Sequence, residues 1–254
     1  MVYRSDWTRD CGKVGIVSGG GSGHEPFAAG LVGNGGLAAA VAGSVFASPP
    51  AGSVLAAIRQ VATPEGVMLI VFNYTGDRIN FGLAAQRARA EGINVSVHFI
   101  QDDCALESED KAVGRRGLLG GITTIKIMAA ASERGYSLEE MKLLFETVTH
   151  PGNLGTIGFS VSGCSLPTGE SGIKLEPGEV ELGLGVHGEP GIKRAKFTGC
   201  QPLIQQLLPS VNRRLNLSPN DQIFLLLNNL GGLTELEMLN ISGSLQEEIA
   251  AKYG

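Results

Sequence analysis

The chain has 254 residues, of which 43% are hydrophobic and 18% are charged, and its formal net charge is -5. This length allows one or two domains with a full hydrophobic core, and the composition excludes an extended disordered chain. The mild acidic excess argues against nucleic acid as the main partner, because phosphate binding needs clustered Lys and Arg. Glycine, with 37 residues, has about twice its usual share, which indicates many tight turns or close backbone approaches.

The sequence gives no sign of export, a metal site or a membrane span. No Cys-x-x-Cys pair occurs, so we expect neither zinc nor a disulfide framework. The first residues have no apolar stretch of the secretory type, and we expect a cytoplasmic protein with reduced thiols. Residues 26–58 carry no charge, but the pair Pro49-Pro50 and many glycines and alanines favour burial in a protein core over a membrane.

The first half of the chain alternates strand and helix patterns. Residues 13–17 and 67–72 predict strands, residues 83–91 predict a helix that ends at Gly92, and residues 94–100 predict the next strand. A strand, a helix and a strand with short joins are typical of a mostly parallel sheet.

Further helices are predicted before a turn near residue 150. One covers residues 121–134, and a capping box that starts at Ser137 opens another, which runs to about residue 148. The turn His150-Pro151-Gly152-Asn153 is the best candidate boundary. We predict two α/β domains, 1–150 and 151–254, with mostly parallel or mixed sheets and an incomplete second domain. The elements expected in that second domain are strands at 156–161 and 223–227, the latter buried, and helices at 201–208 and 245–252.

Two loops follow predicted strands of the first domain. The loop from Gly19 to Pro26 is glycine-rich, and such glycines let backbone N–H groups converge on an anion or a small polar ligand, although a tight turn with a solvated His24 explains it equally well. The loop Asn73-Tyr74-Thr75-Gly76-Asp77 lies where ligands gather in parallel sheets. Asp77 is a candidate proton acceptor there, or the N-cap of the next helix.

A third loop, from Gly183 to Gly191, carries His187 between glycines. The neighbours of His187 offer little side-chain cover, so a ligand-binding role explains this histidine better than a core position does, with a plain exposed loop as the alternative. His98, in a strand pattern, and His150, in a turn, are expected to be structural.

These loops, in this order, resemble those of the dihydroxyacetone kinase family. The likeness covers residues from about 13 to about 237 and is closest to the K domain of the ATP-dependent enzymes, whose eukaryotic members also handle glyceraldehyde. The matching segments are Ser18–Pro26, Asn73–Asp77, Gly114–Gly117, Gly185–Gly191 and Asn228–Gly232.

The resemblance implies a role for each matching residue. The family's substrate histidine, which adds to the ketone and forms a covalent hemiaminal, falls on His187. The carboxylate near the hydroxyl to be phosphorylated falls on Asp77. The loop that holds the substrate and supplies a base falls on Gly21, Ser22, Gly23 and His24. Such a bond would select a ketone over glycerol, and imidazole is largely neutral near pH 7, as this addition requires.

The chain also departs from the family pattern. Phe72 stands where the family usually has a substrate-contacting lysine, and both ends of the chain are shortened relative to the family. The resemblance implies that ATP and magnesium bind a separate helical L domain or a partner subunit, so no cofactor is expected on this chain, and it implies a homodimer. The leading hypothesis is therefore a kinase-type, dihydroxyacetone-binding polypeptide. The alternatives are a carbonyl-binding or regulatory protein without turnover and an inert truncated product.

Overall fold

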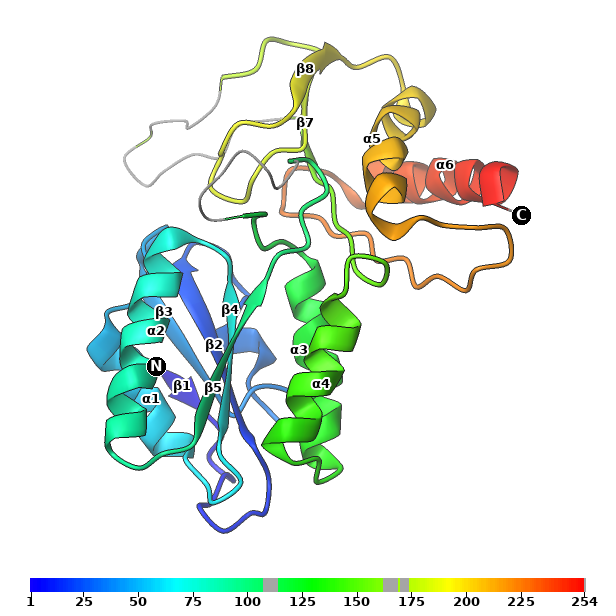
Figure 1. The fold of residues 1–254 in the computed structure, drawn as a ribbon. Helices are drawn as coiled ribbons and strands as arrows, with labels where there is room; N and C mark the ends of the chain where they lie inside the picture. The colour runs from blue at the N-terminus through cyan, green and yellow to red at the C-terminus, as the bar shows by residue number, and fades with distance from the viewer. Residues whose placement is uncertain (107–113, 162–168, 170–173, 254) are drawn as a thin grey trace. The chain divides into compact units, whose positions relative to one another are not determined.

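The computed structural model describes residues 1–106, 114–161, 169 and 174–253. The chain divides into two compact units (Figure 1). The first comprises residues 1–102 and 109–153, and the second comprises residues 103–108 and 154–254. Each unit combines helices with a sheet, so the α/β class expected from the sequence is confirmed.

A five-stranded sheet forms the centre of the first unit. Its strand order is β1-β3-β2-β4-β5, in which β1 is antiparallel to β3 and the other neighbours are parallel. The strands are β1 (Val2–Tyr3), β2 (Gly15–Ser22), β3 (Ala39–Val45), β4 (Val67–Phe72) and β5 (Val95–Ile100). The predicted strands at 67–72 and 94–100 are thus confirmed, and so is the mostly parallel sheet.

Helices cover both faces of this sheet (Figure 1). In the described part of the unit these are a short 3-10 helix, η1 (Ala29–Leu31), and the α-helices α1 (Ala51–Val61), α2 (Thr75–Ala90), α3 (Gly120–Glu133) and α4 (Leu138–Thr149). α2 begins eight residues before the predicted start at Leu83, and the predicted capping box of α4 is present, with Ser137 accepting from the Glu140 N–H. Together they make a layered α/β unit.

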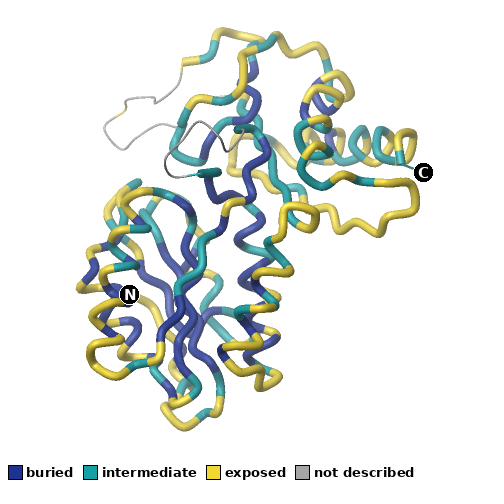
Figure 2. The backbone as a smooth tube through the Cα atoms, viewed as in Figure 1, coloured by how far each residue is buried: buried dark blue, intermediate teal, exposed yellow. Residues whose placement is uncertain are grey.

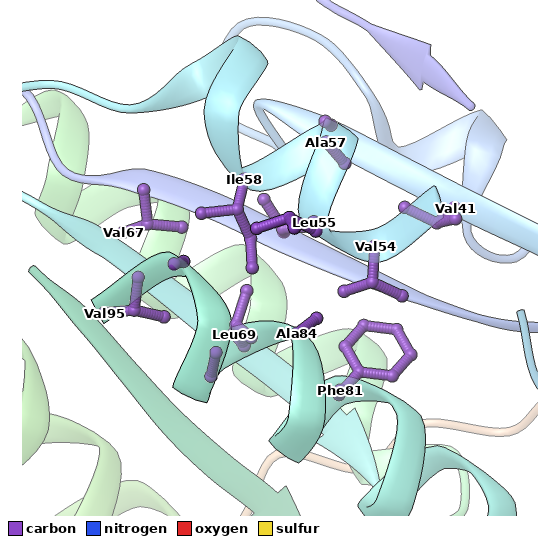
Figure 3. Close-up of a cluster of buried hydrophobic side chains, with 14 of the residues drawn as sticks. Val41, Val54, Leu55, Ala57, Ile58, Val67, Leu69, Phe81, Ala84 and Val95 are labelled. Atoms are coloured by element: carbon purple, nitrogen blue, oxygen red, sulfur yellow. The ribbon is translucent and has the colours of Figure 1, made fainter. Parts of the chain in front are cut away.

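Two apolar cores lie on opposite faces of the sheet. Along β4, Leu69 and Val71 pack with α1 and α2, whereas Met68 and Ile70 pack with α3 and α4. Figure 3 shows the first core, where Phe81 of α2 is fully buried. Burial on both faces explains why β4 is a continuous apolar run rather than an alternating one. The uncharged segment 26–58 also contributes buried residues to both cores, as the sequence predicted.

Strand β2 continues through the glycines that the sequence analysis assigned to a loop. It ends at Ser22 and not at Val17, and Gly19 pairs with Val41 of β3. A Cβ atom at Gly19 would lie 2.1 Å from the Val41 carbonyl oxygen. The two backbones approach so closely that only glycine fits, which is why a strand here lacks the β-branched pattern.

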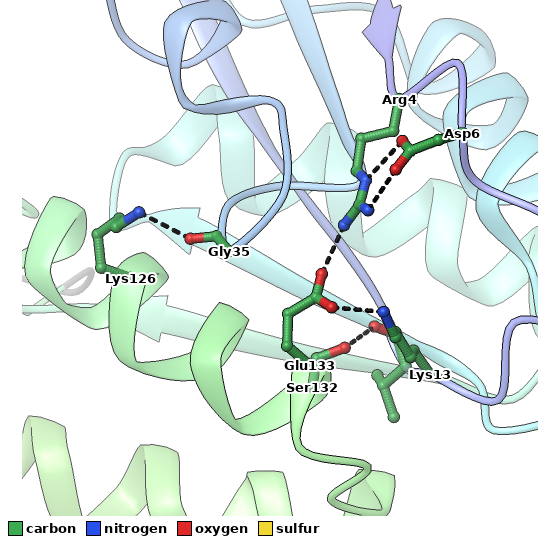
Figure 4. A network of polar contacts seen from close by, with 8 residues as sticks. Arg4, Asp6, Lys13, Gly35, Lys126, Ser132 and Glu133 are labelled. Carbon is green, nitrogen blue, oxygen red and sulfur yellow. Dashed lines mark hydrogen bonds and ion pairs between the residues drawn. The ribbon is translucent and has the colours of Figure 1, made fainter.

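An ion-pair network joins the N-terminal segment to α3 (Figure 4). Arg4, which is only 8% exposed, bonds to Glu133 at 2.6 Å and to Asp6 at 2.8 Å, and Lys13 pairs with the same Glu133. Hydrogen bonding from Lys13, and then from Arg4, lowers the pKa of Glu133 below its usual value. Close by, Lys126 donates to the Gly35 carbonyl at 2.7 Å. These contacts tie the first residues to the body of the unit.

The described residues of the second unit form a three-stranded antiparallel sheet in the order β6-β7-β8 and two helices. Among the described residues of this unit, the apolar cluster is small and has four buried members: Val180, Leu182, Leu203 and Leu207. The elements are β6 (Phe159–Ser160), β7 (Glu179–Leu182), β8 (Lys193–Lys196), α5 (Cys200–Leu215) and α6 (Glu235–Tyr253).

Several predictions for this unit are wrong. The segment 223–227 is neither a strand nor buried, and Phe224 is 83% exposed. No described strand pairs with this apolar segment. Figure 2 colours the chain by burial, with exposed stretches in yellow. The strand predicted at 156–161 shortens to Phe159–Ser160. Both helices are longer than expected, and α6 starts after a capping contact in which Thr234 accepts from the Glu237 N–H, a signal that the sequence analysis missed.

Within the described part of the chain, every helix is too short or too polar to cross a membrane.

Candidate functional site

The first unit gathers its candidate residues at the carboxyl ends of parallel strands. Gly21 and Ser22 end β2, Gly23 and His24 follow it, and Phe72 ends β4, which is the neighbour of β2. Asp77 lies in the first turn of α2, three residues after Tyr74. Since the carboxyl ends of parallel strands meet at one edge, these residues share the edge where ligands bind in such sheets.

The glycine-rich loop is shaped by backbone contacts and by one aromatic ring. The Ser22 hydroxyl donates to the Gly43 carbonyl at 2.7 Å, and the Gly23 N–H donates to the Glu25 carboxylate at 2.9 Å. The Phe46 ring centre lies 5.1 Å from that of His24. A Cβ at Gly23, whose φ is +103°, would lie 2.7 Å from the same ring. The Phe46 ring therefore packs against both Gly23 and His24, a contact that no pattern in the sequence indicates.

The turn after β3 connects the two loops of this unit. A Cβ at Gly21 would lie 2.6 Å from the Ala47 nitrogen, and one at Gly76 would lie 3.1 Å from the Ser48 Cβ. Residues 46–48 thus pass against Gly21 and also against Gly76, which precedes Asp77. The geometry brings the glycine-rich loop and the start of α2 together around one short turn.

Asp77 is buried at 7% exposure, and it is not the helix N-cap. That position belongs to Tyr74, so the N-cap alternative considered from the sequence is wrong. A carboxylate in the first helical turn is stabilised by the partial positive charge of the helix N-terminus. Asp77 thus lies at this edge of the sheet, within the first turn of α2, where a carboxyl oxygen can accept hydrogen bonds.

The Gly114–Gly117 segment lies directly over the end of β4. The Asn73 side chain donates to the Arg115 carbonyl at 2.7 Å, and the Tyr74 hydroxyl donates to the Gly117 carbonyl at 3.2 Å. A Cβ at Gly117 would lie 2.9 Å from the Asn73 nitrogen. Two motifs about 40 residues apart in the sequence are therefore in contact, and glycine at 117 permits the approach.

Phe72 points to the α3 side of the sheet. Its ring lies 4.7 Å from that of Phe27 in an edge-on arrangement, and a Cβ at Gly121 would lie 2.2 Å from it. The Phe72 ring fills space that is free because Gly121 has no side chain. Phe72 therefore presents an apolar surface, and its side chain cannot donate a hydrogen bond.

In the second unit, His187 lies on the loop between β7 and β8. Gly188 N–H donates to the Gly185 carbonyl at 3.1 Å, which makes a tight turn around the histidine. The base of the loop is held by Glu181, whose carboxylate accepts from the Gly191 N–H and from Arg194, both at 2.9 Å. The bond from Gly191 is the main cause that lowers the pKa of Glu181.

Glu189 contacts His187 directly, and the sequence analysis gave Glu189 no role. One carboxylate oxygen lies 2.8 Å from Nδ1 of the imidazole, and the other accepts from the His187 backbone N–H at 3.0 Å. Burial by itself would raise the pKa of Glu189, but these hydrogen bonds outweigh burial and lower the pKa to about 2. The imidazole is 24% exposed, so it is less bare than the sequence suggested, yet it is still reachable from solvent.

The two remaining histidines occupy other surroundings. His98 lies on β5 against the Phe145 ring, and burial, with help from the Lys142 charge, lowers its pKa to about 4. His150 is the C-cap of α4, and its Nδ1 accepts from the Gly152 N–H. Six of the seven predicted site residues, Gly21, Ser22, Gly23, His24, Phe72 and Asp77, thus lie in the first unit, and His187 belongs to the second.

Comparison with known proteins identifies the family. The model of the Dak1 domain matches residues 1–254, the whole chain. The chain belongs to the Dak1 domain family. It is 42% identical over 255 residues to the dihydroxyacetone-binding subunit DhaK of a PTS-dependent dihydroxyacetone kinase 1 from Listeria innocua, a match that covers 97% of this chain and 77% of that one.

Two further similarities involve longer proteins. The chain is 45% identical over 245 residues to mouse triokinase/FMN cyclase, which covers 94% of this chain and 42% of the relative. The crystal structure of the dihydroxyacetone kinase of C. freundii superimposes with a TM-score of 0.86 at 37% identity, covering 96% of this chain and 44% of that one. The Dak1 chain thus spans less than half the length of these two relatives.

Proposed function

We propose that the chain binds dihydroxyacetone, or another small carbonyl triose, through a reversible covalent bond to His187 and presents a hydroxyl for phosphorylation. The observation that carries this proposal is the imidazole of His187, which is solvent-reachable and held by a carboxylate on a tight loop. The similarity to a subunit whose name states that it binds dihydroxyacetone supports the choice of ligand.

The chemistry explains why a histidine would serve here. Dihydroxyacetone is small, and hydrogen bonds by themselves give such a ligand little affinity. In the proposed step, an imidazole nitrogen lone pair forms a bond to the carbonyl carbon while the C=O π pair moves to oxygen. The proton that the imidazole loses is matched by one that the oxygen gains, which leaves a neutral hemiaminal. Glycerol has no carbonyl group and cannot form this bond, so the site would reject it.

Residues of the first unit would then act on the terminal hydroxyl. The loop of Gly21, Ser22, Gly23 and His24 would hold the substrate, while Asp77 and His24 would orient or deprotonate the attacking hydroxyl. Positioning of this kind is much of what an acceptor site contributes to phosphoryl transfer. The phosphate would come from ATP with magnesium, bound by a separate nucleotide-binding domain or subunit, and the binding chain would act as a homodimer in the cytoplasm.

The test is ligand binding measured by calorimetry on the intact chain and on two matched variants. We expect the unmodified protein to bind dihydroxyacetone and to ignore glycerol. His187→Ala should reduce ketone binding at least about tenfold, because the covalent bond is lost. His150→Ala, which removes a histidine that caps α4, should keep the preference for the ketone. Equal binding of ketone and glycerol, or an unchanged affinity in His187→Ala, would contradict the proposal.

A carbonyl-binding protein without turnover is the second candidate. The packing of Phe72 favours it, because an apolar ring between Phe27 and Gly121 replaces a side chain that would donate hydrogen bonds to the substrate. A turnover assay with a separately added helical nucleotide-binding domain distinguishes the two. Formation of the phosphate ester supports the kinase role, whereas ketone-selective binding without any product supports the second candidate.

A further inference from the structure

We propose that Glu189 is the positioning residue for His187: its carboxylate holds the neutral imidazole in the tautomer with the proton on Nδ1, so that Nε2 is the nitrogen with the nucleophilic lone pair. This inference rests on the proposed function and adds to it the atom that attacks the carbonyl and the residue that selects this atom.

The geometry supports this selection through two hydrogen bonds to one residue. One oxygen of Glu189 lies 2.8 Å from Nδ1, and the other accepts from the backbone N–H of His187 at 3.0 Å. A carboxylate that uses both oxygens on the same residue cannot rotate freely. It therefore fixes the direction of the ring as well as the position of the proton.

The charge state of Glu189 determines which tautomer of His187 can form this hydrogen bond. A pKa of about 2 means that the group is ionised at neutral pH. An ionised carboxylate only accepts hydrogen bonds, and Nδ1 must therefore be the donor when the two are bonded. In a neutral imidazole with its proton on Nδ1, the lone pair available for addition is on Nε2.

The same carboxylate also suits the proposed addition step. When Nε2 bonds to the carbonyl carbon, positive charge develops on the ring before the Nδ1 proton is lost. A negative group 2.8 Å from Nδ1 stabilises that charge where it forms. The electron pair moves from Nε2 to carbon and the C=O π pair moves to oxygen, which takes up a proton. No oxidant or further reactant is needed.

A second carboxylate of the loop provides a matched control. Glu181 holds the base of the loop: one of its carboxylate oxygens accepts from Gly191 and the other from Arg194, rather than from the imidazole. Loss of either carboxylate loosens the loop, but only loss of Glu189 removes the partner of Nδ1. Glu181→Gln therefore separates loop stability from ring positioning.

The experiment is ¹⁵N NMR of the histidine rings in the ligand-free protein, with His187 assigned by the His187→Ala variant. We expect the Nδ1–H tautomer in the unmodified protein and in Glu181→Gln. In Glu189→Gln we expect a mixed or reversed tautomer, because the amide can donate as well as accept. Dihydroxyacetone binding should weaken by about 10–100-fold in Glu189→Gln, by analogy with the loss seen when the partner that orients a metal-ligating histidine is removed.

The outcomes separate this inference from the function on which it rests. An Nε2–H tautomer in the unmodified protein, or an unchanged tautomer and affinity in Glu189→Gln, overturns the role of Glu189. If the tautomer shifts as expected while the unmodified protein fails to bind the ketone, the proposed function is wrong but the positioning of the ring by Glu189 stands. A Glu189→Asp variant that regains part of the tautomer preference further supports the charge-based role.

Discussion

The two units differ in how they hold their candidate residues. In the first, the loops at the sheet edge stand on a sheet with a core on each face, and glycines let backbones touch, as at Gly19 and Gly21. In the second, the described apolar cluster has only four buried members, and the histidine loop is held by the carboxylates of Glu181 and Glu189. A large core can position a loop by packing, whereas a small one depends on directional polar contacts.

The prediction with the largest expected effect compares how much each core contributes to the free energy of unfolding. Phe81→Ala should cost about 3–5 kcal/mol, because a fully buried ring is lost from the first core, whereas Leu207→Ala in the second core should cost nearer 2 kcal/mol. Trp7, the single tryptophan, packs against the first core, so its fluorescence reports on unfolding of that unit.

Denaturant titration followed by Trp7 fluorescence and by far-UV circular dichroism checks this difference. Phe81→Ala should move the fluorescence midpoint, and Leu207→Ala should move mainly the dichroism signal. Equal fluorescence shifts in the two variants would mean that the units unfold together, and the contrast between their cores would then not apply to stability.

An intermediate effect concerns acid stability of the first unit. His98 has a folded pKa of about 4, below the ordinary value of 6.5, because burial disfavours its charged form. The unfolded chain therefore binds a proton first, so stability is complete above about pH 6.5 and falls as the pH drops towards 4. Discounted for partial solvent exposure, the loss should be about 1–2 kcal/mol.

The check is unfolding measured at pH 7 and at pH 4.5 for the unmodified chain and for His98→Leu. The leucine variant should lose less stability between the two pH values, because Nε2 of His98 is buried and has no hydrogen-bond partner among the described residues. His150→Leu is the matched control. Identical pH profiles for all three proteins would show that His98 does not titrate as described.

The smallest expected effect tests the exposed segment of the second unit. Phe224 is 83% exposed, so Phe224→Ser should change the free energy of unfolding by less than about 0.5 kcal/mol. Binding of a hydrophobic dye should fall, since the ring contributes to an exposed apolar run. Thermal unfolding and dye fluorescence measure both quantities, and a loss above about 1 kcal/mol would show that the ring is packed.

The elements that could be predicted from the sequence are those with a clear local signal, such as an apolar run or a capping box. β4 is a continuous apolar run and is buried on both faces, and α4 begins at the expected capping box. The run at 223–227 looks equally apolar, yet it is exposed. An apolar pattern indicates what a segment could bury, but it does not indicate whether a neighbouring strand is present to cover it.

The candidate site residues could be picked out from the sequence by their type and position, but the contacts between them could not. His187 stood out between glycines, and Glu189 was visible two residues later. Their hydrogen bond depends on the tight turn from Gly185 to Gly188, which no periodic pattern encodes. The contact of Phe46 with His24 depends likewise on where β3 ends, and such tertiary proximity is not a property of local sequence.

The turn at residues 46–48 offers a place from which to observe the site. Ala47 is exposed, and its backbone lies against Gly21, while the next residue lies against Gly76. A fluorophore attached at this position would stand beside the glycine-rich loop and the start of α2 at once. A change in its emission on addition of dihydroxyacetone would test the proposed binding without a label on any of the proposed site residues.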